Sequence, residues 1–144
     1  MLDTNVALDW LVFRDPRARP LIAALERGEL VWLATPGMRQ ELAWMLSHDS
    51  LARWAPDRER ALAAFDAHAT ICDPAPLPMP AGLRCTDPDD QAFIDLAVVG
   101  CARWLLSHDR AVLKLARRLR KHGVEALRPA DWASLYGVPT VAQN

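Results

Sequence analysis

Short apolar runs alternate along this chain with longer segments in which apolar residues recur every three or four positions. The short runs predict buried strands, and the longer segments predict helices with one apolar face. The strands are expected at residues 1–3, 30–34, 69–72, 104–107 and 124–127. The helices are expected at residues 5–13, 17–27, 36–46, 56–68, 87–100, 110–121 and 129–136.

This alternation predicts an α/β fold, in which a parallel sheet carries helices on both faces. The 144 residues fit a single domain spanning 1–144, since domains commonly contain about 100–200 residues. Four prolines between residues 73 and 80 predict an extended loop there. In sheets of this kind the ligand site lies beyond the carboxyl ends of the strands. The residues that follow each predicted strand are therefore the first candidates for function.

The composition excludes several classes of protein. With 51% hydrophobic and 24% charged residues and a net charge of −1, the chain is too apolar and too balanced in charge to be disordered. No apolar run approaches the roughly 18–20 residues that cross a bilayer. The first residues lack the basic and apolar regions of a signal peptide. We therefore expect a soluble, cytoplasmic protein that does not contact a membrane.

Acidic residues stand where the predicted strands end. Asp3 directly follows the first strand and Asp109 follows the fourth, so both are expected at the same edge of the sheet. Glu41 lies at the border of the apolar stripe of its helix, where an ionised carboxylate is rare unless it is paired or binds a metal. Each residue also has a purely structural interpretation. Asp3 and Asp109 can cap helices, and Glu41 can pair with an arginine.

Four acidic residues lie between residues 86 and 95 with no basic residue among them. They are Asp87, Asp89, Asp90 and Asp95. Capping of the following helix would explain Asp87, and the positive end of that helix would favour its neighbours. Like charges this close together repel, and a cation would relieve the repulsion. Hard divalent cations such as Mg²⁺ and Mn²⁺ take oxygen ligands and can activate water for phosphodiester cleavage.

Four stretches of the chain, in this order, resemble the motifs of PIN-domain ribonucleases. They are Leu2-Asp3-Thr4-Asn5-Val6, Glu41-Leu42, Asp87-Pro88-Asp89-Asp90 with Phe93 and Ala97, and Leu105-Leu106-Ser107-His108-Asp109. The nearest resemblance is to PIN-family toxins of type II toxin–antitoxin systems, which are related to VapC-type toxins. It extends from residue 1 to about residue 130.

The resemblance implies a Rossmann-like PIN domain with a parallel sheet of order 3-2-1-4-5. It implies an endoribonuclease that hydrolyses RNA with Mg²⁺ or Mn²⁺, has a cognate antitoxin protein as a partner, and forms a homodimer. The residues that match the catalytic and metal-binding positions are Asp3, Glu41, Asp90 and Asp109, with Asp87 as an alternative ligand. The residues that match the supporting polar positions are Thr4, Asn5 and Ser107.

The predicted helix 110–121 carries six basic residues and no acidic one. On one side of it lie Arg110, Lys114 and Arg117, which we expect to contact RNA phosphates. The alternative is a solvated helix side, on which cations near the carboxyl end are favourable.

Only Met1 and Leu2 precede Asp3, whereas PIN chains similar to this one usually have several apolar residues there. Either the first strand begins upstream of Met1, or the fold tolerates a truncated strand. Three other functions stay open. The protein could be a solitary RNA-processing nuclease, or a PIN-like binding module with a weak site. It could also be a phosphotransfer enzyme with Asp3 as nucleophile, but that chemistry needs a lysine near a strand end, and both lysines lie inside a predicted helix.

Overall fold

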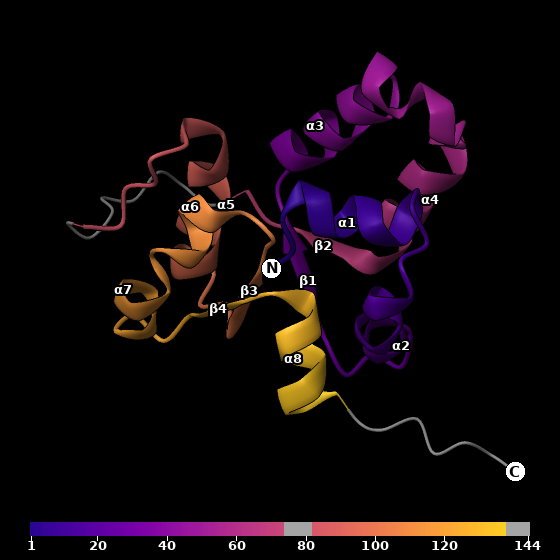
Figure 1. The fold of residues 1–144 in the computed structure, drawn as a ribbon. Coiled ribbons are helices and arrows are strands. Elements are labelled where there is room, and N and C mark those ends of the chain that lie inside the picture. The colour runs from indigo at the N-terminus through magenta and orange to yellow at the C-terminus, as the bar shows by residue number, and fades with distance from the viewer. Residues whose placement is uncertain (74–81, 138–144) are drawn as a thin grey trace, which may run out of the picture.

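Two parallel pairs of short strands form the β-structure of the protein (Figure 1). The computed structural model describes residues 1–73 and 82–137. In the first pair β1 (Trp32–Ala34) lies beside β2 (Ala69–Ile71), and in the second β3 (Trp104–Leu106) lies beside β4 (Glu125–Leu127). Four of the five expected strands are thus confirmed, with slightly narrower bounds, and the fold is α/β.

The first residues pair with β3 but do not form a full strand. Leu2 makes an isolated parallel bridge with Leu106. The Asp3 amide donates to the Leu106 carbonyl at 3.1 Å, and the Leu106 amide donates to the Met1 carbonyl at 2.9 Å. In the part of the chain that the structure describes, no ladder joins this segment to β1. The five-stranded order 3-2-1-4-5 is therefore not confirmed.

The segment before β2 contains four α-helices and two short 3₁₀ helices. Each long helix begins where a polar side chain or a proline favours it, as when the Thr35 hydroxyl accepts from the Met38 amide at 3.2 Å. The helices are α1 (Thr4–Leu11), α2 (Arg19–Glu26), α3 (Pro36–Leu46) and α4 (Arg58–His68), and the 3₁₀ helices are Pro16–Ala18 and Asp49–Trp54.

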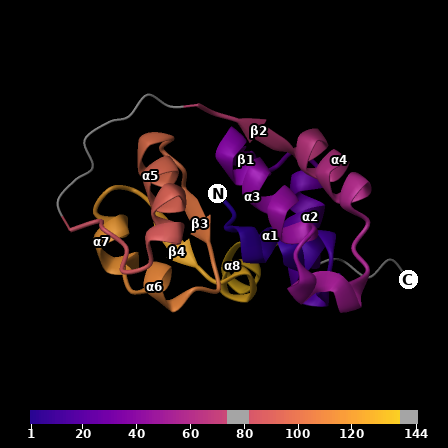
Figure 2. The same ribbon diagram turned by 90° about the horizontal axis from the view of Figure 1, so that it is seen from above.

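The rest of the chain wraps helices around β3 and β4. They are a 3₁₀ helix (Pro88–Asp90), α5 (Gln91–Val99), α6 (Arg110–Leu113), α7 (Ala116–Arg120) and α8 (Pro129–Tyr136). From above, the N-terminal segment lies between two halves of the molecule (Figure 2). We call these the β1–β2 half (residues 4–73) and the β3–β4 half (residues 82–137).

The single helix expected at 110–121 is wrong, because the chain forms α6 and α7 with a break between them. At the break the Leu115 amide donates to the Val112 carbonyl three residues back, rather than to the residue four back. Val112, Leu115 and Leu119 are all buried, so the tighter turn keeps three apolar side chains against the core.

Two further differences concern the ends of elements. The helix expected at 5–13 ends at Leu11, shortly before Arg14 takes a left-handed φ of 52°. The helix expected at 17–27 is divided into a 3₁₀ turn and α2, since Asp15 caps the turn through the Arg17 amide. The loop expected at 73–80 lies outside the described residues, except for Asp73.

The core runs through both halves. Val6 of α1, Phe65 of α4, Ile94 of α5 and Leu105 of β3 are almost completely buried. The helices among the described residues are too short or too polar to cross a bilayer. Since α1 packs into this core directly after Asp3, the core fixes the position of that carboxylate.

Candidate metal centre

Three carboxylates of the β3–β4 half lie close together. Asp87, Asp90 and Asp109 each offer an oxygen within 4.8 Å of the others, and all three side chains are partly buried. We call them the acidic group. Asp87 caps the 3₁₀ turn before α5 and Asp90 is the last residue of that turn, whereas Asp109 caps α6 in the loop after β3. Within the described ranges none of them forms an ion pair.

Capping holds two members of the acidic group in place. Asp87 Oδ1 accepts from the Asp89 amide at 3.0 Å, and Asp109 Oδ1 accepts from the Ala111 amide at 2.7 Å. The capping interpretation of these residues is therefore correct. It does not compete with a metal site, because each cap uses one oxygen and a carboxylate has two.

Asp90 makes no cap and lacks a partner for one buried oxygen. Its Oδ2 is the one carboxyl oxygen of the described chain that is buried without a hydrogen-bond donor. Burial, the negative charge of Asp109, a hydrogen bond with that residue, and the charges of Asp87 and Asp3 together raise the pKa of Asp90 to about 7. A buried acceptor without a donor, surrounded by like charges, fits a hard cation.

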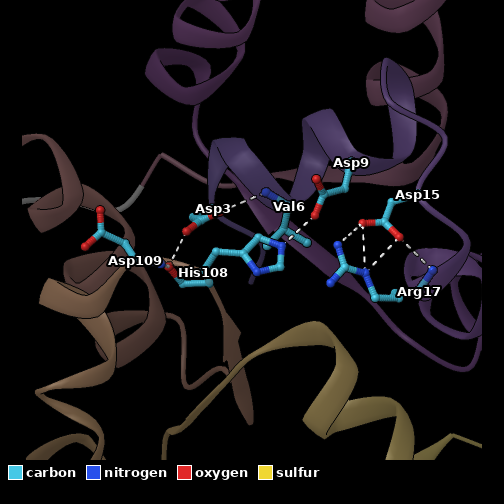
Figure 3. A network of polar contacts seen from close by, with 8 residues as sticks. Asp3, Val6, Asp9, Asp15, Arg17, His108 and Asp109 are labelled. Atoms are coloured by element: carbon cyan, nitrogen blue, oxygen red, sulfur yellow. Dashed lines mark hydrogen bonds and ion pairs between the residues drawn. The ribbon is translucent and has the colours of Figure 1, made fainter.

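Asp3 lies beside the acidic group and is held by hydrogen bonds. It is 2% exposed, its Oδ1 accepts from the Val6 amide at 2.9 Å, and its Oδ2 accepts from the Ser107 hydroxyl. Burial raises the pKa of Asp3, while the bonds from Ser107 and Val6 oppose this rise. Ser107 Oγ also accepts from the Asp109 amide at 2.9 Å. Figure 3 shows Asp3 and Asp109 in the same part of the molecule.

Glu41 reaches the same region from α3 but does not join the acidic group. Its Oε2 accepts from the Thr4 hydroxyl at 2.6 Å, and Thr4 follows Asp3 in the chain. We call Asp3 and Glu41 the hydroxyl-bound pair, because a hydroxyl group donates to each of them.

The structure thus divides the predicted quartet. Asp90 and Asp109 are brought together with Asp87, the residue expected only as an alternative ligand. Asp3 connects to them through Ser107, and Glu41 connects to Asp3 only through Thr4. Of the supporting residues, Thr4 and Ser107 make the hydrogen bonds described above. Asn5 is exposed and makes no side-chain hydrogen bond with the described residues.

Two features near the site were missed in the sequence. Gln91 accepts from the Cys85 amide at 2.6 Å, and this bond fixes the segment before the acidic group. Gln91 also donates to Asp95 at 2.7 Å, so one of the four clustered acids already has a hydrogen-bond partner. His108 lies 2.5 Å from Asp9. A histidine next to Asp109 was a visible signal, but nothing in the sequence indicates its partner in α1.

The basic residues of α6 and α7 begin directly after the acidic group. Arg110, Lys114 and Arg117 are exposed, as expected for residues that contact a ligand or solvent. Arg118 has a structural contact, because its guanidinium donates to the Gly82 carbonyl at 3.0 Å.

No curated protein and no solved structure matches this chain. A family model described as the PIN domain matches residues 1–111. The matched range contains every carboxylate of the acidic group and of the hydroxyl-bound pair and covers more than half of the 144 residues. The chain therefore belongs to the PIN-domain family.

Proposed function

We propose that this protein is a metal-dependent endoribonuclease that hydrolyses phosphodiester bonds in RNA. PIN domains are generally nucleases, and the acidic group supplies the ligand type that Mg²⁺ and Mn²⁺ prefer. The observation that carries the proposal is the buried Asp90 Oδ2, which has no donor in the described part of the chain. A cation at this position would satisfy that oxygen and relieve the repulsion within the acidic group.

Asp87, Asp90 and Asp109 would hold the ion, with Asp3 close enough to contribute charge. When bound, such an ion lowers the pKa of water and stabilises negative charge on phosphate oxygens. The chain's own residues prepare the site. Asp90 must release a proton before it can serve as a ligand, because its pKa lies near 7.

The hydroxyl-bound pair has a supporting part in this proposal. Ser107 and Thr4 orient the carboxylates of Asp3 and Glu41. The second oxygen of Glu41 can receive a ligand or a bound water, whereas both oxygens of Asp3 already accept hydrogen bonds. Both hydroxyls are fixed by their partners, so the carboxylates do not need to reorganise when substrate arrives. We also propose Asn5, the third residue that matches a supporting polar position, as a supporting residue.

Exposed bases beside the acidic group would bind the RNA backbone. Arg110, Lys114 and Arg117 follow Asp109 within eight positions and are not neutralised by acids in the same segment. Phosphate contacts of this kind position a nucleic acid without reading its sequence. We therefore expect the affinity for RNA to fall with increasing salt concentration.

Incubation of the protein with single-stranded RNA and Mn²⁺ tests the proposal. Cleavage is expected to stop in excess EDTA, to leave 5′-phosphate ends, and to be abolished by Asp3→Asn. Equal cleavage by the wild type and Asp3→Asn, or cleavage that persists in EDTA, would contradict the proposed site. Binding of RNA without cleavage would instead favour a PIN-like binding module.

The biological role that we propose is that of the toxin in a toxin–antitoxin pair, with a homodimer as the active form. This rests on the resemblance of the motifs Leu2–Val6 and Leu105–Asp109 to such toxins. Induced expression of the protein should arrest growth of a bacterial host, and co-expression of a small neighbouring gene product should restore it. Growth that is unaffected by an active nuclease would favour a solitary RNA-processing enzyme. Light scattering of the purified protein tests the dimer.

A further inference from the structure

A second contact joins α1 to the loop that carries Asp109. His108 Nε2 lies 2.5 Å from Asp9 Oδ2, although the two residues are 99 positions apart. The Asp9 side chain is 17% exposed and the His108 side chain is 39% exposed, so solvent only partly surrounds the contact. Neither residue is a member of the acidic group.

His108 is the hydrogen-bond partner of the Asp9 side chain among the described residues. Arg17 lies near enough to interact electrostatically with Asp9, but its guanidinium donates to both oxygens of Asp15 at 2.7–3.1 Å. The Asp15–Arg17 pair and the Asp9–His108 pair are drawn side by side in Figure 3. Asp9 therefore depends on His108 for its hydrogen bond.

Three consecutive residues of the loop after β3 have three different partners. Ser107 donates to Asp3, His108 contacts Asp9, and Asp109 faces the rest of the acidic group. Asp3 and Asp9 are six positions apart, which is about 9 Å along a helix axis. The loop is thus attached to α1 at two separate points, and these points precede Asp109.

The short elements around Asp109 give this double attachment its importance. β3 has 3 residues and α6 has 4, so neither element alone holds the loop firmly. At Ser107 the loop is held by the bond to Asp3 and by the Ser107 amide, which donates to the Leu127 carbonyl at 3.0 Å. The contact at His108 restrains the loop at a further point, toward the other end of α1.

We propose that Asp9 and His108 are positioning residues, which hold the Asp109 carboxylate where it can bind a divalent cation together with Asp87 and Asp90. The inference rests on the proposed function only in requiring that such a cation binds. Residues that support metal ligands without touching the metal commonly change metal affinity by 10- to 100-fold when they are replaced. Because this pair acts through the loop, we expect the lower end of that range.

Titration of the full-length protein with Mn²⁺, followed by calorimetry or by the paramagnetic resonance signal of free Mn²⁺, tests the inference. Asp9→Ala and His108→Ala should each weaken Mn²⁺ binding about tenfold. The double variant should bind no more weakly than either single variant, since the two side chains act as one contact. His108→Gln, whose amide nitrogen reaches the position of Nε2, should restore part of the affinity.

Asp66→Ala is the matched control. It breaks the ion pair between Asp66 and Arg39, which joins α3 to α4 with nitrogen–oxygen distances of 2.6 and 2.7 Å. Both Asp9→Ala and Asp66→Ala should lower the melting temperature slightly, but only Asp9→Ala should change the Mn²⁺ affinity. A merely structural role of Asp9 would give equal effects on stability and no effect on Mn²⁺.

The outcomes separate this inference from the proposed function. Unchanged Mn²⁺ affinity in both single variants, or losses that add in the double variant, would overturn the inference while nuclease activity stood. Coupled losses of Mn²⁺ affinity in a protein that cleaves no RNA would support the inference and contradict the nuclease. Failure of the wild type to bind Mn²⁺ would overturn both.

Discussion

The acidic group and the hydroxyl-bound pair contain the same kind of side chain in different surroundings. In the acidic group a buried oxygen of Asp90 has no donor, and neighbouring charges help to raise its pKa to about 7. In the hydroxyl-bound pair Ser107 donates to Asp3 and Thr4 donates to Glu41. The role of a carboxylate therefore depends on whether the protein already supplies hydrogen-bond donors to its oxygens. The first set could hold a cation, whereas hydrogen bonds already hold the second set in place.

Among changes within the acidic group, Asp90→Asn should have the largest effect. It removes the carboxylate whose Oδ2 lacks a donor. We expect RNA cleavage to fall by more than about 100-fold, because this residue would touch the ion directly. Replacing residues that only support metal ligands already lowers metal affinity or activity by 10- to 100-fold. Initial rates in saturating Mn²⁺ measure the loss.

The neighbouring Asp89→Asn provides the matched control. Asp89 is exposed and is not a member of the acidic group, so the change removes the same charge without removing a ligand. Its cleavage rate should stay close to that of the wild type. Equal losses in the two variants would mean that net negative charge, rather than the geometry of the acidic group, governs activity.

Ser107→Ala should break the hydroxyl-bound pair at Asp3. The variant leaves a buried carboxylate oxygen without its donor and also removes the acceptor of the Asp109 amide. We expect a loss of about 1–3 kcal/mol in the free energy of unfolding, because unsatisfied buried polar groups are costly. Urea denaturation measures it. Ser134→Ala, which removes an exposed hydroxyl on α8, should change the value by less than about 0.5 kcal/mol.

The pKa of Asp90 predicts how pH changes both Mn²⁺ binding and the stability of the fold. Below pH 7 a proton competes with the cation, so the apparent Kd for Mn²⁺ should weaken by about tenfold per pH unit. In the absence of metal, raising the pH lowers the stability of the fold, whereas it strengthens Mn²⁺ binding. The folded chain keeps a proton on Asp90 between about pH 4 and pH 7 that the unfolded chain has released, so the free energy of unfolding falls as pH rises through this range.

Calorimetric titrations at pH 6, 7 and 8 measure the first effect, and urea denaturation in EDTA measures the second. Asp90→Asn should remove most of both. If the variant kept the full pH dependence of stability, another group would be responsible for it.

Thr4→Val should have the smallest effect on stability and tests whether Glu41 contributes to cleavage. The valine keeps the shape of the side chain but cannot donate to Glu41 Oε2. A loss of about 0.5 kcal/mol is expected, near the lower end for a hydrogen bond, because Glu41 is partly exposed. Thr70→Val, at an exposed position of β2, should have no effect on cleavage. A large loss of cleavage in Thr4→Val but not in Thr70→Val would mean that Glu41 takes part in metal binding together with the acidic group.

The sequence predicted most of the elements and the region of the site. The strand segments around β1, β2, β3 and β4 were found because each is a short apolar run between turn residues. The rule that ligands gather beyond strand ends correctly placed Asp3 near Asp109, as their connection through Ser107 shows. These features depend on local pattern and on topology, both of which a sequence displays.

Other features depend on contacts that a sequence does not display. The ranking of Asp90 above Asp87 could not reveal that both belong to the acidic group, because a cap and a ligand have the same sequence signature. The Asp9–His108 contact joins residues 99 positions apart. The break between α6 and α7 follows from burial of Leu115, and the periodicity of the segment does not distinguish it from one continuous helix.

The bond from Ser107 to Asp3 spans 104 positions of the chain, and this has a consequence for synthesis. During translation the N-terminal half leaves the ribosome first, and its Asp3 has no Ser107 to donate to it. Asp87 and Asp90 also lack Asp109 until β3 and the loop after it have emerged. A chain that is still being translated therefore has no complete acidic site near its own messenger RNA. The proposed nuclease site can form only after most of the chain is free to fold.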